Sequence, residues 1–239
     1  MPVHGAGGYK KALEKQIIEK YKINNHVLDC VDSAKYLGRT LDSKLSFRTH
    51  VQVTCKKANS TRQFLQRNLS GCNRATKDLC YKAYVRPILE YGASAWDPHK
   101  GNQSQVNMLE AVQNWSARFV CADWRFRSSI TAMISSLKWE SLQERRARAR
   151  VALFQKAYYD HVAIPMTLFE PLPMSCRGAH QKFIVPHCNT TKHENSFVPA
   201  VVKLWNTLPA NITTISDPVL FRTQLCAVKL CTVKPKSSV

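Results

Sequence analysis

Residues 46–69 read SFRTHVQVTCKKANSTRQFLQRNL, and apolar or small residues recur in this stretch largely at the spacing of a helix. These positions are Phe47, Val51, Cys55, Ala58, Phe64, Leu65 and Leu69. Ser46 precedes them, and its hydroxyl can accept a hydrogen bond from an amide of the first turn, whereas Gly71 favours a helix end. The pattern predicts a long helix over residues 46–69.

The other face of this predicted helix is basic. Five cations are spread along it, and residues 46–69 contain no Asp or Glu; the cations are Arg48, Lys56, Lys57, Arg62 and Arg67. Such a face is either a solvated surface or a contact for phosphate groups. Five basic residues without an acid favour phosphate contact, and we predict that these side chains bind nucleic acid.

The whole chain also has an excess of basic over acidic residues. Its 239 residues include 35 Lys and Arg against 16 Asp and Glu, which leaves a net charge of +19 and an isoelectric point near 9.8. A surface of this kind attracts polyanions before any specific contact forms, so nucleic acid is the leading partner. The basic residues lie in segments that also carry regular apolar positions, which indicates faces of folded helices. A basic protein that is merely soluble stays an alternative.

Helical periodicity continues after residue 71. Asn73 can cap a second helix, which Pro87 should kink or interrupt because proline lacks an amide donor and crowds the preceding turn. A third helix is predicted over residues 104–121, a short fourth with Ser128 as a possible cap, and a fifth over residues 139–159. Arg145, Arg146, Arg148 and Arg150 spread around the fifth, so it should be partly exposed or in contact with phosphate.

The two ends of the chain differ from this central region. Residues 162–195 contain four prolines and a glycine, which predicts an irregular connection and the best internal boundary. Two helices should follow it, over 196–208 and 217–230, the second with Asp217 as N-cap and Pro218 at its first position. Before residue 46, two β-leaning runs over 23–31 and 34–41 flank Asp32-Ser33, which predicts a β-hairpin with its turn there.

Neither a metal site nor a catalytic site is predicted. Two-metal nucleotidyl transfer needs clustered carboxylates, and the nearest approach, Asp29 and Asp32, fits strand-end and turn roles better. The His and Cys residues between Cys176 and His193 lack the paired spacing of a zinc site. Nine cysteines at irregular spacings, no secretory run in residues 1–11 and no long apolar stretch predict an intracellular protein, in nucleus or cytoplasm, that is neither secreted nor membrane-bound.

Seven motifs, in order, carry a resemblance to a known family. They are Ser33–Gly38 with Thr40–Phe47, Lys57–Asn59 with Phe64–Leu69, Tyr84–Gly92 with Trp96–Pro98, Leu109–Gln113 with Ala117–Val120, Leu137–Trp139, Leu142–Arg146, and Ser196–Pro199 with Leu204–Pro209. Together they resemble the C-terminal region of non-LTR retrotransposon reverse transcriptases of the jockey and chicken-repeat type. The resemblance extends over about residues 22–226.

The resemblance implies a fold and a partner. It makes Lys35, Tyr36, Leu37 and Gly38 part of a primer-grip turn and the following helices a thumb-like bundle that binds RNA, DNA or an RNA–DNA hybrid through phosphates. The family's catalytic palm and its Mg²⁺-binding aspartates would lie upstream of residue 22. We therefore expect a chain without cofactor or polymerase activity of its own, although the full-length parent would be an RNA-directed DNA polymerase.

Periodicity and resemblance together predict a mainly α fold, with a short N-terminal β-hairpin, a multi-helix thumb-like bundle and a C-terminal helical pair. The expected parts are a variable segment 1–21, a palm-end hairpin remnant 22–45, a thumb-like domain 46–161, an irregular connection 162–195 and a C-terminal helical segment 196–239. Arg145 and Arg146 join the predicted nucleic-acid contacts. Four tryptophans are predicted to be core residues: Trp96, Trp115, Trp139 and Trp205. A decayed or repurposed helical protein without a nucleic-acid role is the alternative hypothesis.

Overall fold

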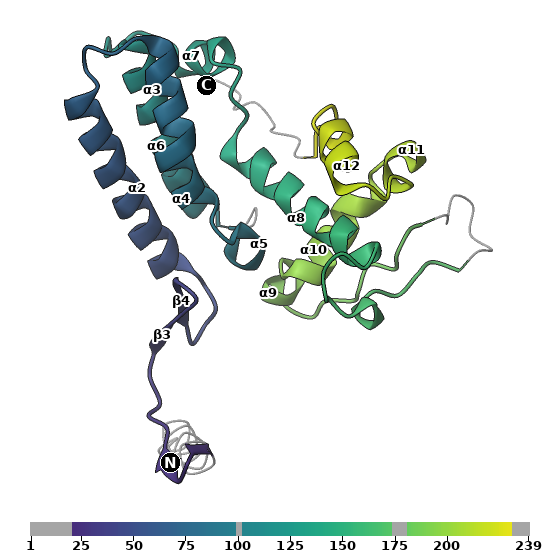
Figure 1. The fold of residues 1–239 in the computed structure, drawn as a ribbon. Helices are drawn as coiled ribbons and strands as arrows, with labels where there is room; N and C mark the ends of the chain where they lie inside the picture. The colour runs from purple at the N-terminus through teal and green to yellow at the C-terminus, as the bar shows by residue number, and fades with distance from the viewer. Residues whose placement is uncertain (1–20, 99–101, 174–180, 231–239) are drawn as a thin grey trace, which may run out of the picture. The chain divides into compact units, whose positions relative to one another are not determined.

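The computed structural model describes residues 21–98, 102–173 and 181–230, and Figure 1 shows its elements. It is 57% helix and 7% strand, which confirms the mainly α prediction. The chain forms two compact units, the first ending at Thr49 and the second beginning at His50. None of the described helices is both long and apolar enough to cross a membrane.

The first unit contains two short hairpins where one was predicted. Strand β1 (Lys22–Ile23) pairs with β2 (His26–Val27), and β3 (Ser33–Tyr36) pairs with β4 (Arg39–Asp42), both antiparallel. The predicted turn at Asp32-Ser33 is wrong, because Ser33 is already the first residue of β3.

The turn of the second hairpin is formed by Leu37 and Gly38. Both have positive φ angles, 46° and 78°, as does the pair Asn24 (48°) and Asn25 (63°) in the first hairpin. Two-residue loops with positive φ match the twist of the strands that they join, and Asn and Gly reach this region at little steric cost. Leu37 has no such freedom, so the tip of the second hairpin carries backbone strain.

The carboxylate of Asp42 holds the loop between β4 and the long helix α2 (Arg48–Asn68). It accepts hydrogen bonds of 3.0 Å from the amides of Lys44, Ser46 and Phe47 and from the Ser46 hydroxyl. Burial by itself raises the pKa of Asp42, but these hydrogen bonds outweigh it and lower the pKa. The Ser46 hydroxyl accepts from the Arg48 amide at 3.4 Å, but α2 begins at Arg48, so Ser46 lies one residue before the cap position predicted for it.

The second helical region shows the predicted interruption at Pro87. It runs as α3 (Arg74–Cys80), a π-helical turn η1 (Tyr81–Val85) and α4 (Arg86–Glu90), with Pro87 in the first turn of α4. The wider π turn fits a proline that lacks an amide donor. Asn73 caps α3 as predicted, because its side-chain oxygen accepts from the Thr76 amide at 2.9 Å.

The next four helices of the second unit are α5 (Ala93–Trp96), α6 (Gln103–Cys121), α7 (Ile130–Ser136) and α8 (Leu142–Tyr158). The bounds of α6 confirm the helix predicted over 104–121 to within one residue, whereas α8 begins three residues after the predicted start at 139, with Ser141 as its cap. The cap of α7 is Ser129, one residue after the predicted Ser128, and its hydroxyl accepts from the Ala132 amide at 3.3 Å.

The C-terminal part packs on α8. Its elements are η3 (Met166–Leu168), α9 (Thr191–Glu194), α10 (Phe197–Asn206), α11 (Ala210–Thr213) and α12 (Pro218–Leu225). Asp217 caps α12 as predicted, accepting from two amides at 3.1 Å. Phe154 of α8 lies in one buried cluster with Trp205 and Phe221, so α8 belongs to both the central and the C-terminal helices. Residues 162–195 therefore do not separate two compact units.

Candidate nucleic-acid interface

The exposed side of α2 within the second unit carries three predicted contact residues. Lys56, Lys57 and Arg67 are all exposed, and among the residues that the structure describes no carboxylate pairs with any of them. Lys56 and Arg67 are eleven residues apart, which is roughly 16 Å along a helix, or about five base-pair steps of a duplex. Three cations without carboxylate partners thus lie along one helix, over a length comparable to about five base-pair steps of a duplex.

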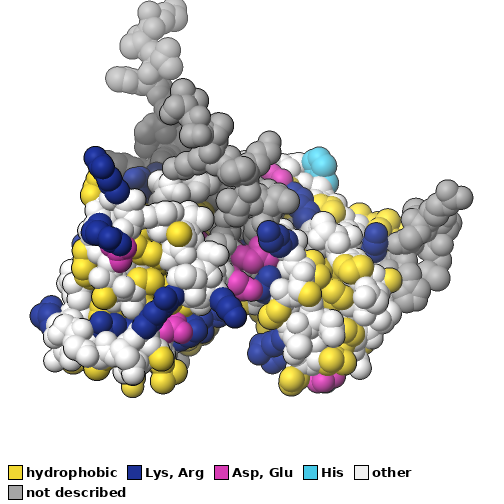
Figure 2. Space-filling view, turned by 90° about the horizontal axis from the view of Figure 1, so that it is seen from above, with side chains coloured by type: hydrophobic (Ala, Val, Ile, Leu, Met, Phe, Trp, Pro, Cys, Tyr) yellow, Lys and Arg dark blue, Asp and Glu magenta, His cyan; other side chains and the backbone are white. Residues whose placement is uncertain are grey.

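On the face shown in Figure 2, Lys and Arg side chains outnumber Asp and Glu among the described residues. The described acidic side chains include several that pair internally with arginines, which leaves cations to dominate the surface. A positive, solvent-facing surface is the electrostatic requirement for phosphate binding.

Arg62 does not lie on this exposed side, so its predicted place on the basic face is wrong. Its side chain is buried, with Nε donating to Asn59 Oδ1 at 3.3 Å and Nη1 donating to Gln66 Oε1 at 2.9 Å. Burial lowers the pKa of the guanidinium. The sequence contained the signal, because Arg62 lies four residues after Ala58 and three before Leu65, on the apolar stripe of the helix.

The arginines of α8 are bound internally rather than exposed. Arg146 is completely buried and its Nε lies 2.6 Å from Asp97 Oδ1, while Arg150 reaches the other oxygen of Asp97 at 2.8 Å. Arg145 pairs with both carboxylate oxygens of Glu90. The predicted phosphate contact is therefore wrong for Arg146, which has no route to solvent, and Arg145 already has a carboxylate partner.

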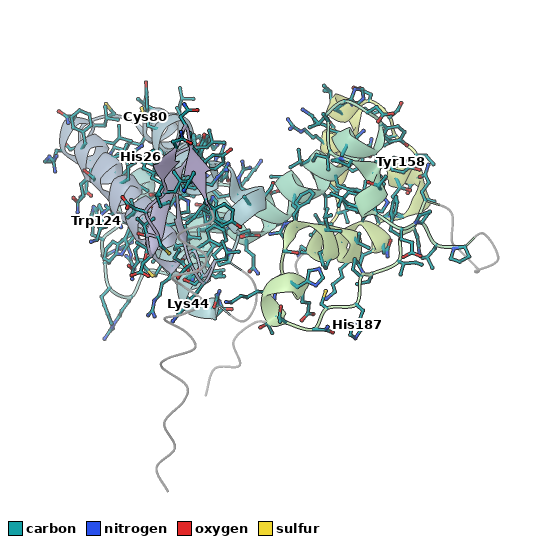
Figure 3. The ribbon with its side chains drawn as sticks, turned by 90° about the horizontal axis from the view of Figure 1, so that it is seen from below. His26, Lys44, Cys80, Trp124, Tyr158 and His187 are labelled. Atoms are coloured by element: carbon teal, nitrogen blue, oxygen red, sulfur yellow. The ribbon has the colours of Figure 1, made fainter. Side chains whose placement is uncertain are left out.

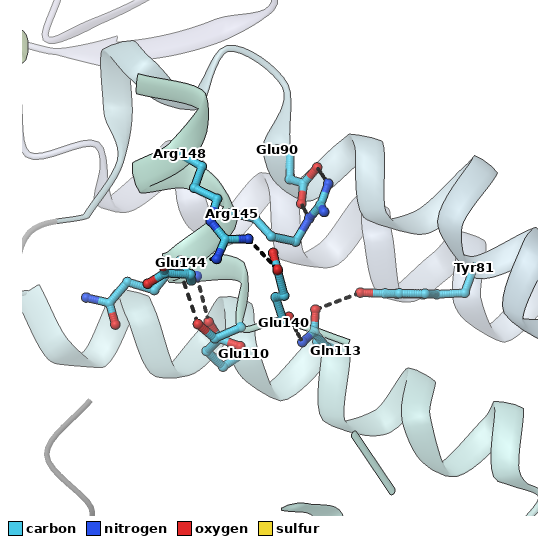
Figure 4. A network of polar contacts seen from close by, with 10 residues as sticks. Tyr81, Glu90, Glu110, Gln113, Glu140, Glu144, Arg145 and Arg148 are labelled. Carbon is cyan, nitrogen blue, oxygen red and sulfur yellow. Dashed lines mark hydrogen bonds and ion pairs between the residues drawn. The ribbon is translucent and has the colours of Figure 1, made fainter. Parts of the chain in front are cut away.

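Further polar contacts hold the first turns of α8, as Figure 4 shows. Arg148 pairs with Glu140. The side-chain amide of Gln113 accepts a hydrogen bond from the Tyr81 hydroxyl and donates one of 2.8 Å to the backbone carbonyl of Glu140. Glu110 accepts from the backbone amide of residue 143 at 3.0 Å. Burial raises the pKa of Glu110, although this hydrogen bond and others act against it.

These contacts give several of the recognised motif residues a structural role. Glu90 pairs with Arg145 and Asp97 with Arg146, and both arginines belong to another motif, Leu142–Arg146. Asn206 acts through its side chain, whose oxygen accepts from the Phe183 amide at 3.1 Å and whose nitrogen donates to the Phe183 carbonyl at 2.7 Å. The motifs that carry the resemblance thus hold the helices together.

The remaining predicted contacts lie in the first unit. Lys35, Tyr36, Leu37 and Gly38 form the end of β3 and the hairpin turn, and all four are exposed. Arg48, the first residue of α2, is exposed as well. The structure therefore leaves these side chains accessible within their own unit.

The tryptophans divide into two groups. Trp96, Trp139 and Trp205 are buried as predicted, but the prediction is wrong for Trp115, whose exposed fraction is 51%. Trp124, which Figure 3 labels, is 47% exposed and was not predicted as a site residue. The signal was present, because Trp124-Arg125-Phe126-Arg127 interleaves aromatic and basic residues, a composition typical of single-strand binding surfaces.

No metal site is formed by the residues that the structure describes, since no three His, Cys, Asp or Glu side chains gather closely enough to hold an ion. Asp29 and Asp32 are both exposed. Cys176 and His180, which belong to the irregular His and Cys segment, lie outside the described residues. Among these described residues there is thus no carboxylate cluster of the kind that two-metal nucleotidyl transfer needs.

Comparison with known proteins agrees with the resemblance at a coarse level. A probable RNA-directed DNA polymerase from transposon BS of Drosophila melanogaster is 29% identical over 125 residues, which are 51% of this chain and 14% of that protein. No family model matches the chain, and no solved structure matches it. About half of this chain is thus similar to a small part of a transposon RNA-directed DNA polymerase.

Proposed function

We propose that this chain is a nucleic-acid-binding segment derived from a retrotransposon reverse transcriptase of the jockey or chicken-repeat type. Its helices would correspond to the region after the catalytic palm, and it would not polymerise alone. The observation that carries the proposal is the exposed row of Lys56, Lys57 and Arg67 on α2, in which no cation has a carboxylate partner among the described residues. The similarity of half the chain to a transposon RNA-directed DNA polymerase also supports an origin in a retrotransposon reverse transcriptase.

Binding would work through phosphate charge. Each cation that neutralises a phosphate releases condensed counterions, so affinity for RNA, DNA or a hybrid should fall steeply with salt and depend little on sequence. The exposed hairpin residues Lys35 to Gly38 and Arg48 would add contacts from the first unit. Arg62, Arg145 and Arg146 would support the fold instead, because they are buried or paired.

The test is a salt titration of binding to a blunt DNA duplex. Changing Lys56, Lys57 and Arg67 together to Gln should reduce the log–log slope by about 2 to 3 units, if each contacts one phosphate at roughly 0.9 unit. The matched control removes the same charge from the C-terminal region by changing exposed Lys192, Arg222 and Lys229 to Gln, and it should leave the slope nearly unchanged.

A folded α2 variant that keeps the parental slope would contradict the proposal and favour a helical protein without a nucleic-acid role. Equal losses in the two triple variants would mean that net charge alone, rather than α2, governs binding. Primer extension by the purified chain with Mg²⁺ or Mn²⁺ would contradict the expected lack of polymerase activity.

A further inference from the structure

A shallow cleft of about 390 Å³ lies between α2, α6 and the segment after α6 in the second unit. Its size falls at the lower end of the range of small-ligand sites, roughly 300–1,000 Å³. Two aromatic rings, two amides and two guanidinium groups line it, from Arg62, Gln63, Gln66, Arg67, Trp115 and Trp124. The proposed function uses only Arg67 of this set.

The aromatic wall of the cleft consists of Trp115 and Trp124. Their ring centroids are 6.3 Å apart with an angle of 28° between the planes, and each side chain is about half exposed. Large aromatic side chains are mostly buried in folded proteins, so two adjacent exposed indoles form an uncommon surface. Such surfaces suit nucleobases, because every base presents a flat π face for stacking.

The segment that carries Trp124 is held in place before any ligand arrives. Arg118 of α6 donates from Nη1 to the carbonyl oxygens of Asp123 at 3.3 Å and Arg125 at 2.9 Å. The guanidinium of Arg125 in turn forms two hydrogen bonds of 3.1 Å to the carboxylate of Asp123. Binding would therefore cost little ordering of this aromatic wall.

The opposite wall is cationic. Arg67 is exposed, and Arg62 is buried with only the neutral side chains of Asn59 and Gln66 as hydrogen-bond partners; in the described part of the chain neither arginine has a carboxylate partner. A buried cation without a counterion is costly, and an anion bound nearby would offset part of that cost. The cleft thus combines a stacking surface with a place for one negative charge.

We propose that this cleft binds one unpaired nucleotide of a nucleic-acid strand. The base stacks on Trp115 or Trp124, and Arg67, with the charge of Arg62 behind it, holds the adjoining phosphate. The amide of Gln63 faces the base edge, and Arg62 positions Gln66 through their hydrogen bond. This inference rests on the proposed function and adds to it a site that distinguishes unpaired nucleotides from a bare phosphate backbone.

The experiment compares two labelled single strands of equal length, oligothymidylate and an abasic strand with the same number of phosphates. The full chain should prefer the base-bearing strand by roughly 5- to 150-fold, the effect of about 1–3 kcal/mol expected for one stacked base. Changing Trp115 and Trp124 together to Ala should abolish the preference and leave the affinity for the abasic strand unchanged. Tyr84→Ala, at another aromatic residue 61% exposed and outside the cleft, is the matched control and should keep the preference.

Absence of the preference in the wild-type chain, or its survival in the double tryptophan variant, would overturn the inference while leaving phosphate binding intact. Failure to bind the abasic strand and the blunt duplex alike would instead overturn the proposed function. Circular dichroism confirms that the variant is folded. If it is not, a 2-aminopurine strand tests the wild-type chain directly: fluorescence quenching on binding is expected, and unchanged fluorescence in the bound state would contradict the site.

Discussion

Helices α2 and α8 each carry five Lys or Arg residues, yet the two helices use them in opposite ways. In α2, Lys56, Lys57 and Arg67 face solvent without a carboxylate partner among the described residues. In α8, Arg145, Arg146, Arg148 and Arg150 all pair with carboxylates that lie outside this helix, from Glu90, Asp97 and Glu140. A count of cations on a helix therefore does not identify an interface. Whether the cations are available to a ligand depends on the carboxylates that the fold brings next to the helix.

The largest expected effect comes from removing the carboxylate shared by two arginines of α8. Asp97→Asn keeps the shape of the side chain but leaves Arg146 and Arg150 without their counterion in a buried setting. Breaking a buried ion pair in this way should lower the free energy of unfolding by about 3–5 kcal/mol, measured by urea denaturation. The same substitution at exposed Asp160 should change it by less than about 0.5 kcal/mol, and equal effects at the two sites would refute the buried pairing.

A second prediction uses the buried face of α2, where Cys55 lies close to Arg146. Burial raises the pKa of the Cys55 thiol to about 11, although the positive charge of Arg146 acts to lower it. The pKa of Cys55 is thus higher in the folded chain than in the unfolded chain. The contribution of the thiol to stability is therefore complete below the unfolded pKa near 9.0, and it is lost as the pH rises through about 11. The free energy of unfolding should fall by roughly 2–3 kcal/mol over this pH range.

The measurement is the difference in unfolding free energy between the wild-type chain and Cys55→Ala as a function of pH. Taking the difference removes the titration of the lysines and tyrosines, which both proteins share. A difference that stays constant between pH 8 and pH 11 would show that the thiol is accessible to water.

A third prediction concerns the partly exposed pair of Arg145 and Glu90. Glu90→Gln should lower the unfolding free energy by about 1 kcal/mol, less than Asp97→Asn, because water screens this pair. Thermal unfolding of the two variants side by side gives the ranking. A larger loss for Glu90→Gln would reverse the order that burial predicts.

The smallest effect on stability is expected in α2. Changing Lys56, Lys57 or Arg67 singly to Gln should shift the unfolding free energy by no more than about 0.5 kcal/mol, because each side chain is exposed and unpaired. These same changes should reduce the salt dependence of nucleic-acid binding, which separates function from stability. A loss above about 1 kcal/mol would point to a structural partner of the lysine or arginine concerned.

Local patterns predicted much of the secondary structure. Periodicity located α2, α6 and α8 to within a few residues, since a helix with one buried face repeats apolar residues at three- and four-residue intervals. Asn73 and Asp217 were correctly predicted as caps, and Pro87 as an interruption, because these effects act over one turn of chain. The β-pattern misplaced the hairpin turn at Asp32-Ser33, because it does not show the positive-φ pair Asn24-Asn25, whereas the resemblance already implies a turn at Leu37-Gly38.

The sequence by itself determined the mainly helical class, the basic character and the ordered motifs that carry the resemblance, because these are read from composition and from short stretches of chain. Only the tertiary structure decided that the arginines of α8 are not available to a ligand. Asp97 lies 49 positions before Arg146, and Glu90 lies 55 before Arg145, so no local pattern reveals those pairs. The exposure of Trp115 was equally hidden, since it depends on what packs against the side chain, and packing joins residues that are distant along the chain.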